Sequence, residues 1–407
     1  MPAELQNEIA PLVPFRAMPS LISEGMERLR ILHVMARLGT GGTEHGVLKV
    51  VDGLGHDRFE HRFCAVRGLD PGFGSHMGLA AQAYSVGTSK PGQQFPLLRL
   101  VRIMRQFRPH IVHSRNFGAL DAVAAARLAG VPVTIHSEHG YELDILTGLP
   151  FRRRILYRTL LPMADAVFTV SNDLRIFHSR QSQLPLDSFR VLYNGVDTDR
   201  FSSQPIERAN IRKQLGVPAS RLVLGSVGRL VPLKDHGTLL KAAELILRRG
   251  RDIHVVLVGG GSELPKLKAY VEGSTELAGR VSFTGASEDI PGLLNSMDIF
   301  VLPSISEGMS NTVLEAMASG LPVVVTRAGG NPELVDEGRN GLFFPPGDAV
   351  MLADLLDGLA NAPDQRRALG DAGRHRVLDE FSLPAMVHRY RELYFELAAR
   401  RGTVRGE

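Results

Sequence analysis

Short runs of apolar and β-branched residues alternate with longer amphipathic stretches from about residue 30 onward. Such short buried runs are typical of strands in a parallel sheet, and the longer stretches have the spacing of helices. The alternation therefore predicts βαβ units and an α/β fold. The expected strands form two series, 31–36, 61–66, 83–86, 111–114, 133–136, 166–170 and 190–192, then 222–227, 254–258, 281–283, 299–302, 323–326 and 341–344.

A turn-rich break, 193–201 (YNGVDTDRF), separates the two series. Its Asn-Gly step is typical of a turn, so we place a domain boundary there. The prediction is a pair of Rossmann-like, doubly wound domains with parallel sheets, the first over 29–195 and the second over 196–383. The last long amphipathic stretch, 384–401, is expected to form a helix.

Composition limits the class of protein. The chain has 407 residues, enough for two domains, and its 44% of hydrophobic residues is typical of a globular protein. No apolar segment approaches the roughly 20 residues of a membrane-spanning helix. The single cysteine, Cys64, fits a reducing compartment, and the mild net charge of +4 gives no reason to expect a nucleic-acid partner. Residues 1–28 lack the apolar core of a signal peptide, so we expect a loose leader and a cytoplasmic protein.

The stretch 298–330 of the second series concentrates the candidate chemistry (DIFVLPSISEGMSNTVLEAMASGLPVVVTRAGG). It predicts a strand, a loop of small residues and a helix that Ser310 or Asn311 caps. The amino end of a helix offers free amides and partial positive charge to a phosphate. Glu307 and Glu315 lie on either side, where carboxylates can accept hydrogen bonds from sugar hydroxyls. This layout fits a nucleoside-diphosphate sugar; the alternative is an exposed Glu307 and a Glu315 that only stabilises the helix dipole.

The motif EGMSNTVLEAMASGLPVVVTRAGGNPEL resembles the Glu-x7-Glu signature of the family 4 retaining glycosyltransferases, which have the two-domain GT-B fold. HVMARLGTGGTEHGV and HSEHG are similar to segments of bacterial exopolysaccharide and exosortase-associated sugar transferases. The resemblance covers about Arg30 to Phe381. It implies transfer of a sugar from a UDP- or GDP-sugar to a glycan or lipid-linked acceptor, without a metal or other cofactor. It also implies that helix 384–401 crosses back to the first domain.

The resemblance assigns roles to the second domain. Arg229 and Lys234 match the family's Gly-Arg-Leu and Lys-Asp motifs and are expected to bind the diphosphate and stabilise its charge during catalysis. Glu307 is expected to bind the hydroxyls of the sugar and to be a candidate catalytic residue, and Glu315 is expected to bind the ribose. The alternative for Arg229 and Lys234 is that both are solvated surface residues without a ligand. The remaining donor-side residues are Gly260, Gly285, Ser310, Asn311 and Thr312.

In the first domain, Gly41 and Gly42 lie in a loop that lets the backbone approach the diphosphate, although a plain βα turn is the alternative. Glu44 occupies a position where a dinucleotide-binding fingerprint needs glycine, which weakens a dehydrogenase interpretation. His139 matches the family's His-Gly and is expected to be a catalytic residue near the transferred sugar, with His136 as the alternative assignment. These two histidines lack a third ligand at metal-site spacing. The expected acceptor contacts are Arg115, Asn116 and Glu138.

Three further features leave alternatives. Asp197-Thr198-Asp199 resembles a metal motif, but we expect it to cap a turn at the domain junction and to bind no metal. The basic amphipathic stretches 97–108 and 151–158 either lie on an anionic membrane, on the inner face of the plasma membrane, or form solvated helix faces. Two other functions are a sugar-nucleotide 2-epimerase, which needs no acceptor, and a catalytically silent partner that binds a nucleotide sugar.

Overall fold

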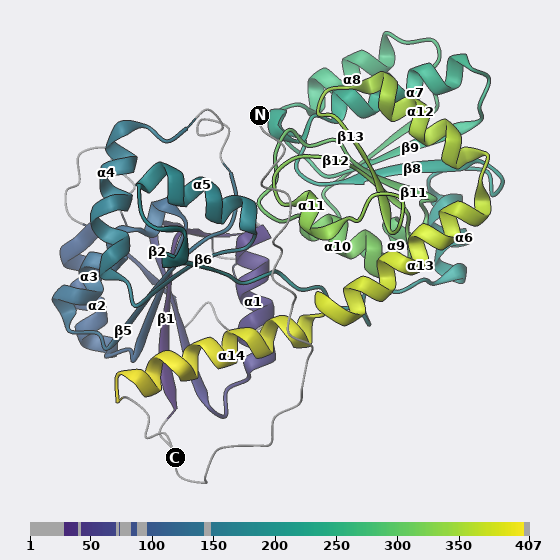
Figure 1. Cartoon of the computed structure of the whole chain (residues 1–407). Helices are drawn as coiled ribbons and strands as arrows, with labels where there is room; N and C mark the ends of the chain where they lie inside the picture. The colour runs from purple at the N-terminus through teal and green to yellow at the C-terminus, as the bar shows by residue number, and fades with distance from the viewer. Residues whose placement is uncertain are drawn as a thin grey trace.

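The computed structural model consists of two lobes, each built on a twisted parallel sheet with helices on both faces (Figure 1). Of the predicted leader 1–28, only Arg28 lies within the described part of the chain. The residues that the structure describes are 28–39, 42–70, 73, 83–87, 96–141 and 148–402.

The first lobe contains a seven-stranded sheet in the order β3-β2-β1-β4-β5-β6-β7. All of its neighbouring strands are parallel. The strands are β1 (Leu29–Leu38), β2 (Phe59–Leu69), β3 (Ala83–Ser85), β4 (Ile111–Arg115), β5 (Val133–Glu138), β6 (Ala166–Thr169) and β7 (Phe189–Val191). The helices are α1 (Gly42–Leu54), α2 (Pro96–Phe107), α3 (Asp121–Ala129), α4 (Phe151–Leu160) and α5 (Asn172–Ser182).

The second lobe contains a six-stranded parallel sheet in the order β10-β9-β8-β11-β12-β13. The strands are β8 (Leu222–Val227), β9 (Ile253–Val258), β10 (Val281–Gly285), β11 (Ile299–Leu302), β12 (Val323–Thr326) and β13 (Gly341–Phe344). The helices that follow β7 are α6 (Pro205–Gln214), α7 (His236–Arg248), α8 (Leu264–Glu272), α9 (Ile290–Asn295), α10 (Asn311–Ala318), α11 (Asn331–Leu334), α12 (Ala349–Ala360), α13 (Pro363–Glu380) and α14 (Leu383–Arg400).

Every strand predicted from the apolar pattern is present, so the predicted fold class is confirmed. The central strands read as continuous apolar runs because helices cover both sheet faces. In the second lobe, for example, every residue of β9 and β12 is buried. Buried helix residues pack on each side of the sheet, which gives the lobe two hydrophobic layers.

The last helix, α14, leaves the second lobe and packs against the first, as predicted (Figure 1). In the picture it is the yellow helix that runs along the lobe containing β1. Tyr390, Leu393, Tyr394 and Leu397 are buried there against apolar residues of the first sheet. Burial of this apolar stripe accounts for the amphipathic pattern of 384–401. None of the helices in the described ranges is long and apolar enough to cross a membrane.

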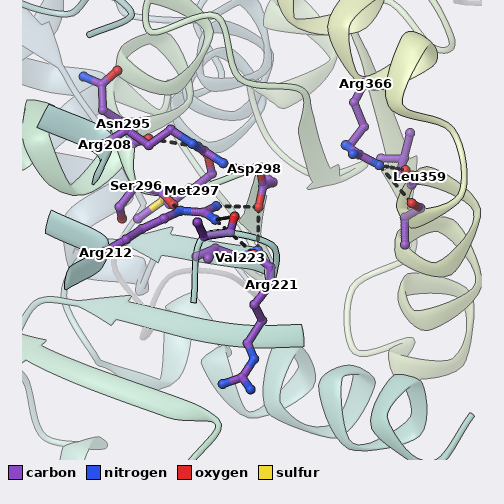
Figure 2. A network of polar contacts seen from close by, with 12 residues as sticks. Arg208, Arg212, Arg221, Val223, Asn295, Ser296, Met297, Asp298, Leu359 and Arg366 are labelled. Carbon is purple, nitrogen blue, oxygen red and sulfur yellow. Dashed lines mark hydrogen bonds and ion pairs between the residues drawn. The ribbon is translucent and has the colours of Figure 1, made fainter. Parts of the chain in front are cut away.

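A polar network ties α6 to the amino edge of the second sheet (Figure 2). Asp298, which precedes β11, accepts hydrogen bonds from Arg208 Nη2 at 2.5 Å and Arg212 Nη2 at 2.7 Å. The backbone N–H of Val223 donates to the same carboxylate at 2.7 Å. Arg212 is 4% exposed and also donates to the carbonyl oxygen of Ser296 at 2.9 Å. The network lies at the edge opposite the carboxyl strand ends, so it supports the fold and not the site.

Candidate active site

A cavity of about 530 Å³ lies between the lobes. This volume is in the range of small-molecule sites. Its walls come from loops after the strands of both sheets, which is where ligands bind in doubly wound folds. The predicted residues in its lining are Gly42, Asn116, Glu138, His139, Arg229, Lys234, Glu307, Ser310, Asn311 and Thr312.

The cations of the second lobe lie in this cavity. Arg229 follows β8, and Lys234 ends a short 3₁₀ turn, Pro232–Lys234. The ammonium of Lys234 forms an ion pair with the Glu307 carboxylate. Ser304 Oγ donates to the same carboxylate oxygen at 2.6 Å. Arg229 is exposed, and its side chain has no hydrogen-bond or ion-pair partner among the residues that the structure describes, so its guanidinium is available to an anion.

The amino end of α10 forms the adjoining wall. Ser310 is the N-cap, and its hydroxyl accepts a hydrogen bond from the Val313 N–H at 3.4 Å. The amides of Asn311 and Thr312, the first two residues of the helix, have no partner within it. Both residues line the cavity. Together with Arg229 and Lys234, this helix end gives the second lobe a positively polarised wall.

Three glycines allow the loops of this wall to approach one another. A Cβ at Gly308 would lie 2.7 Å from the carbonyl oxygen of His139, in the other lobe. A Cβ at Gly330 would lie 2.1 Å from the carbonyl oxygen of Gly308. Gly329 has a φ of +56°, which L-residues with side chains rarely adopt. The AGG segment after β12 therefore shapes the cleft as a packing element.

Glu315 lies one turn further along α10 and is not part of the cavity lining. Its carboxylate is 3.9 Å from Lys49 Nζ on α1, in the other lobe, and its side chain is 15% exposed. Burial raises the pKa of Glu315 to about 6, although the positive charge of Lys49 opposes this effect. The carboxylate that we expect to bind ribose therefore contacts the other lobe in this structure.

In the first lobe, His139 follows β5 and lines the cavity. Its Nε2 lies 2.8 Å from Ser137 Oγ, and its backbone N–H donates to Asn116 Oδ1 at 2.9 Å. Burial and the nearby charge of Arg115 lower the pKa of His139 to about 3. The imidazole is therefore neutral at physiological pH. His136, the alternative, is fully buried and absent from the lining, so His139 is the histidine that reaches the cavity.

Glu138 also lines the cavity, although it is only 3% exposed. One carboxylate oxygen, Oε1, accepts from the Tyr157 hydroxyl at 2.6 Å and contacts His136 Nε2 at 2.9 Å. Burial alone raises the pKa of Glu138, but the contacts with His178 and His136 outweigh burial and hold this pKa below its usual value. The residue is thus a fixed, ionised hydrogen-bond acceptor at the rim of the first lobe.

Besides Glu315, three predicted site residues that the structure describes are absent from the cavity lining. Arg115 is 1% exposed, because its side chain turns into the layer between the sheet and α14 and not toward the cleft. Gly260 and Gly285 are absent from the lining; the carbonyl oxygen of Gly260 accepts from Leu230 N, and that of Gly285 from Gly259 N, each at 2.8 Å. These turns hold the loops together. Gly41 lies outside the described residues.

Other lining residues have no distinctive motif in the sequence. Asn194 Nδ2 donates to Asn311 Oδ1 at 3.0 Å and links the interdomain turn to α10. Met386 and Tyr390 come from α14, which reaches the cavity only because that helix crosses between the lobes. The first lobe contributes further residues to the lining, among them Tyr141, Arg153 and Tyr157.

Asp197 caps a turn, as predicted: its Oδ1 accepts from the backbone N–H of Asp199 at 3.1 Å and of Arg200 at 3.0 Å. Within the described ranges, no group of three or more His, Cys, Asp or Glu side chains is placed to hold a metal ion.

Comparison with known proteins identifies the family. Residues 40–200 match the family model of Glycosyltransferase Family 4, and residues 207–376 match that of Glycosyl transferases group 1. The Mycobacterium tuberculosis GDP-mannose-dependent alpha-(1-6)-phosphatidylinositol monomannoside mannosyltransferase is 34% identical, over 68% of this chain and 74% of that protein. The Escherichia coli UDP-Gal:alpha-D-GlcNAc-diphosphoundecaprenol alpha-1,3-galactosyltransferase is 28% identical, over 74% of this chain and 79% of that protein.

Solved structures agree on the fold. Anabaena Alr3699/HepE, in complex with UDP, superimposes with a TM-score of 0.78 at 22% identity and covers 90% of this chain and 100% of its own. Sucrose-phosphate synthase from Thermosynechococcus elongatus gives a TM-score of 0.77 at 22% identity, with 92% and 100% covered. The two family matches span both lobes, and the folds agree over nearly the whole chain. This chain therefore belongs to the family 4 glycosyltransferases and has the GT-B fold.

Proposed function

We propose that this glycosyltransferase moves a sugar from a nucleotide sugar to a lipid-linked or glycan acceptor in cell-surface glycan synthesis, with retention of anomeric configuration. The observation that carries the proposal is that Arg229, Lys234 and the amino end of α10 line one cavity, and that the guanidinium of Arg229 has no partner among the described residues. A diphosphate needs such cations and N–H donors, and arginine can bind it in a bidentate manner. The second lobe therefore binds the donor.

Donor binding exchanges one ion pair for another. In this structure Lys234 is neutralised by Glu307. A diphosphate placed between Arg229 and Lys234 competes for the ammonium and leaves the Glu307 carboxylate free to accept hydrogen bonds from the sugar hydroxyls. The two cations supply the countercharge, and the proposal includes no metal or other cofactor. The nucleotide is UDP or GDP.

The same arrangement supports the chemistry. The bond between the anomeric carbon and the phosphate oxygen breaks, and the acceptor oxygen bonds to the same face of the sugar. The acceptor's proton passes to the departing phosphate oxygen. Arg229, Lys234 and the α10 amides stabilise the charge that develops on the diphosphate, an effect that is largest where the groups are fixed before reaction. His139 bounds the cavity from the first lobe, and closure of the lobes excludes water.

A lipid-linked acceptor is supported by the relatives. The mycobacterial enzyme is named for a phosphatidylinositol mannoside acceptor, and the E. coli enzyme for a diphosphoundecaprenol acceptor. We extend this acceptor class to the present chain, with Asn116 and Glu138 as contacts on the side of the first lobe. Both residues line the cavity opposite the donor wall.

The surface of α4 supports contact with an anionic membrane on the cytoplasmic side. Phe151 is 74% exposed, Ile155 46% and Leu156 38%, and arginines surround them. The other basic helix, α2, buries most of its apolar residues against the first sheet and leaves Leu98 exposed, whereas Tyr157 is the buried residue of α4. Arg153 of α4 lines the cavity, so a membrane on this face lies next to the acceptor side. A basic helix with exposed apolar residues fits an anionic bilayer.

The other two functions are less well supported. A 2-epimerase needs no acceptor, whereas the relatives are named as sugar transferases. A silent binding partner does not need its donor and acceptor walls to face one cavity, as they do here.

The test is a transfer assay with UDP-, GDP- and ADP-sugars, a polyprenyl-diphosphate-linked sugar and a phosphatidylinositol glycoside, with EDTA present. We expect one donor to give a product whose anomeric configuration, measured by NMR, matches that of the donor. Isomerisation of donor without acceptor indicates an epimerase. Binding of a donor without turnover on any acceptor indicates a silent partner.

A further inference from the structure

A row of buried polar side chains joins two adjacent strands of the first lobe, β4 and β5, beneath His139. His113 and Arg115 lie on β4, two residues apart and thus on one face, and the register pairs Arg115 with Ser137 on β5. Ser137 is fully buried, as is His113. The hydroxyl of Tyr394, on α14, is 2.9 Å from His113 Nδ1 and closes the row from above.

Arg115 fixes the protonation pattern of His113. A guanidinium has only donors, and Arg115 Nη2 lies 3.0 Å from His113 Nδ1, so Nδ1 must accept. Burial and the charge of Arg115 keep the pKa of His113 well below its usual value, and the ring is therefore neutral. A neutral imidazole with an accepting Nδ1 carries its proton on Nε2. That Nε2–H donates to Ser137 Oγ at 3.0 Å.

The hydrogen bonds of Ser137 determine which ring nitrogen of His139 carries the proton. Within the described part of the chain, the only partners of Ser137 Oγ are His113 Nε2 and, at 2.8 Å, His139 Nε2. The hydroxyl already accepts from His113, and a buried hydroxyl hydrogen without an acceptor is unfavourable. Ser137 therefore donates to His139 Nε2. The proton of a neutral His139 is then on Nδ1.

We propose that Arg115, through His113 and Ser137, holds His139 as the Nδ1–H tautomer, so that the cavity wall presents an N–H donor and not a base. His139 Nδ1 has no hydrogen-bond partner among the described residues, and the residue lines the cavity. It therefore donates to an oxygen of the bound ligand, a sugar hydroxyl or a phosphate oxygen. The identity of that oxygen rests on the proposed function. Arg115, His113 and Ser137 are positioning residues, which gives the buried Arg115 a role at the site that it does not touch.

The direct test is ¹⁵N NMR of the full chain with labelled histidine and no donor. The His139 signals are those that disappear in His139→Asn. We expect wild-type His139 to be neutral and protonated on Nδ1, and Ser137→Ala to lose this selection. Ser114→Ala is the matched control, because Ser114 Oγ makes an equivalent buried contact with His136 Nδ1 at 2.8 Å and should leave the tautomer of His139 unchanged. A wild-type His139 that is protonated on Nε2, or that keeps its tautomer in Ser137→Ala, overturns the proposal.

Kinetics provide a second readout. At temperatures below the melting transition of the variant, we expect Ser137→Ala to lower kcat/KM for the donor about tenfold, equivalent to about 1.4 kcal/mol. Ser137→Thr, which keeps the hydroxyl, should restore activity. A wild-type kcat/KM in Ser137→Ala contradicts the proposal. The NMR experiment needs no donor, so it determines the tautomer of His139 even if no sugar transfer is found. Conversely, sugar transfer can be observed even if His139 is not the Nδ1–H tautomer.

Discussion

The donor side of the cavity depends on the guanidinium of Arg229, which has no partner among the described residues. An exposed arginine that stabilised the fold would be expected to contact a carboxylate or a carbonyl group, as Arg400 does with Glu396 at 2.8 Å. Arg229 makes no such contact in the described structure, so its removal should affect binding and not folding.

We expect Arg229→Ala to lower kcat by about a hundredfold, the size seen when one transition-state donor is lost. Arg229→Lys should recover only part of this loss, because an ammonium cannot bind in the bidentate manner. Melting temperatures should stay within about 1 °C of the wild type, because surface substitutions rarely change stability much. Arg339→Ala, an exposed arginine of the same lobe outside the cavity, is the control and should keep full activity. Steady-state kinetics with wild-type kcat in Arg229→Ala would exclude the donor wall described above.

Because of Glu315, we expect the free energy of unfolding to depend on pH. Its pKa is about 6 in the folded protein, above the ordinary glutamate value of 4.5, so the folded state favours the neutral carboxyl. The wild type therefore loses stability as the pH rises from about 4.5 through 6, by about 2 kcal/mol for a pKa difference of this size. Glu315→Gln should be more stable than the wild type by about this amount at pH 8 and equally stable near pH 4.

Urea denaturation at the two pH values measures this difference. Glu272→Gln, an exposed glutamate of α8, is the control and should show no such pH dependence. If Glu315→Gln is less stable than the wild type at pH 8, the Lys49 ion pair outweighs the cost of burial. The carboxylate then stabilises the fold, and the expectation of a raised pKa for Glu315 is wrong. Retention of a carboxylate at this cost fits a residue kept for a ligand.

The sequence predicted the residues of the donor wall better than those below it. Arg229, Lys234 and Glu307 follow strands whose carboxyl ends meet at one edge, so their motifs sufficed. Arg115 also lies at a strand end, but the alternation of side chains along β4 places it on the inner face with His113. The contact between Glu315 and Lys49 has no signal in the sequence, because only the packing of the two lobes brings Lys49 to Glu315.

At the level of elements, the network around Asp298 holds α6 to the second sheet (Figure 2). We expect Asp298→Ala to destabilise the protein by about 3–5 kcal/mol, because it leaves the buried Arg212 without its carboxylate. Asp252 is the matched control: it also pairs with two arginines, Arg221 and Arg280, but its side chain is 58% exposed. Asp252→Ala should cost about 1 kcal/mol or less.

Chemical denaturation provides both values for the Asp298 test. Equal destabilisation by the two variants would show that the burial of Arg212 does not add to the loss in the free energy of unfolding. Activity below the melting transition should persist in Asp298→Ala, since the network lies outside the cavity.

The exposed face of α4 predicts membrane binding. We expect the wild type to bind vesicles that contain phosphatidylglycerol at low salt and to dissociate at high salt, because the arginine attraction is screened. Phe151→Ser with Ile155→Ser should weaken this binding about tenfold or more, since both side chains lose apolar burial in the interface. Ile206→Ser is the control, because Ile206 is 82% exposed on α6 of the other lobe. Sedimentation with vesicles makes the comparison; equal binding by all three proteins would exclude α4 as the contact.

The elements themselves were predictable because both sheets are parallel and covered by helices, so the central strands appear as apolar runs. The exposed apolar residues of α4 were visible in the sequence only as part of a basic helix. Whether an apolar residue of a helix is covered depends on its neighbours in the fold, as the contrast between α2 and α4 shows.

At the scale of the molecule, the site exists only when the lobes meet. Glu333, on α11, accepts hydrogen bonds from the backbone N–H groups of Asn172 at 2.8 Å and Asp173 at 3.0 Å, at the amino end of α5 in the other lobe. The α14 helix contributes Met386 and Tyr390 to the cavity from the far end of the chain. Contacts of such sequence separation have no local pattern, which is why the sequence predicted two lobes but not the residues that join them.

The central claim is that fixed cations and a helix amino end of the second lobe bind the diphosphate between the lobes. A crystal structure with UDP or GDP bound tests it most directly. The account predicts both phosphates within hydrogen-bond distance of Arg229, Lys234 and the amides of Asn311 and Thr312, with Lys234 released from Glu307. A diphosphate bound elsewhere, with the Lys234–Glu307 ion pair intact and Arg229 in solvent, would contradict it.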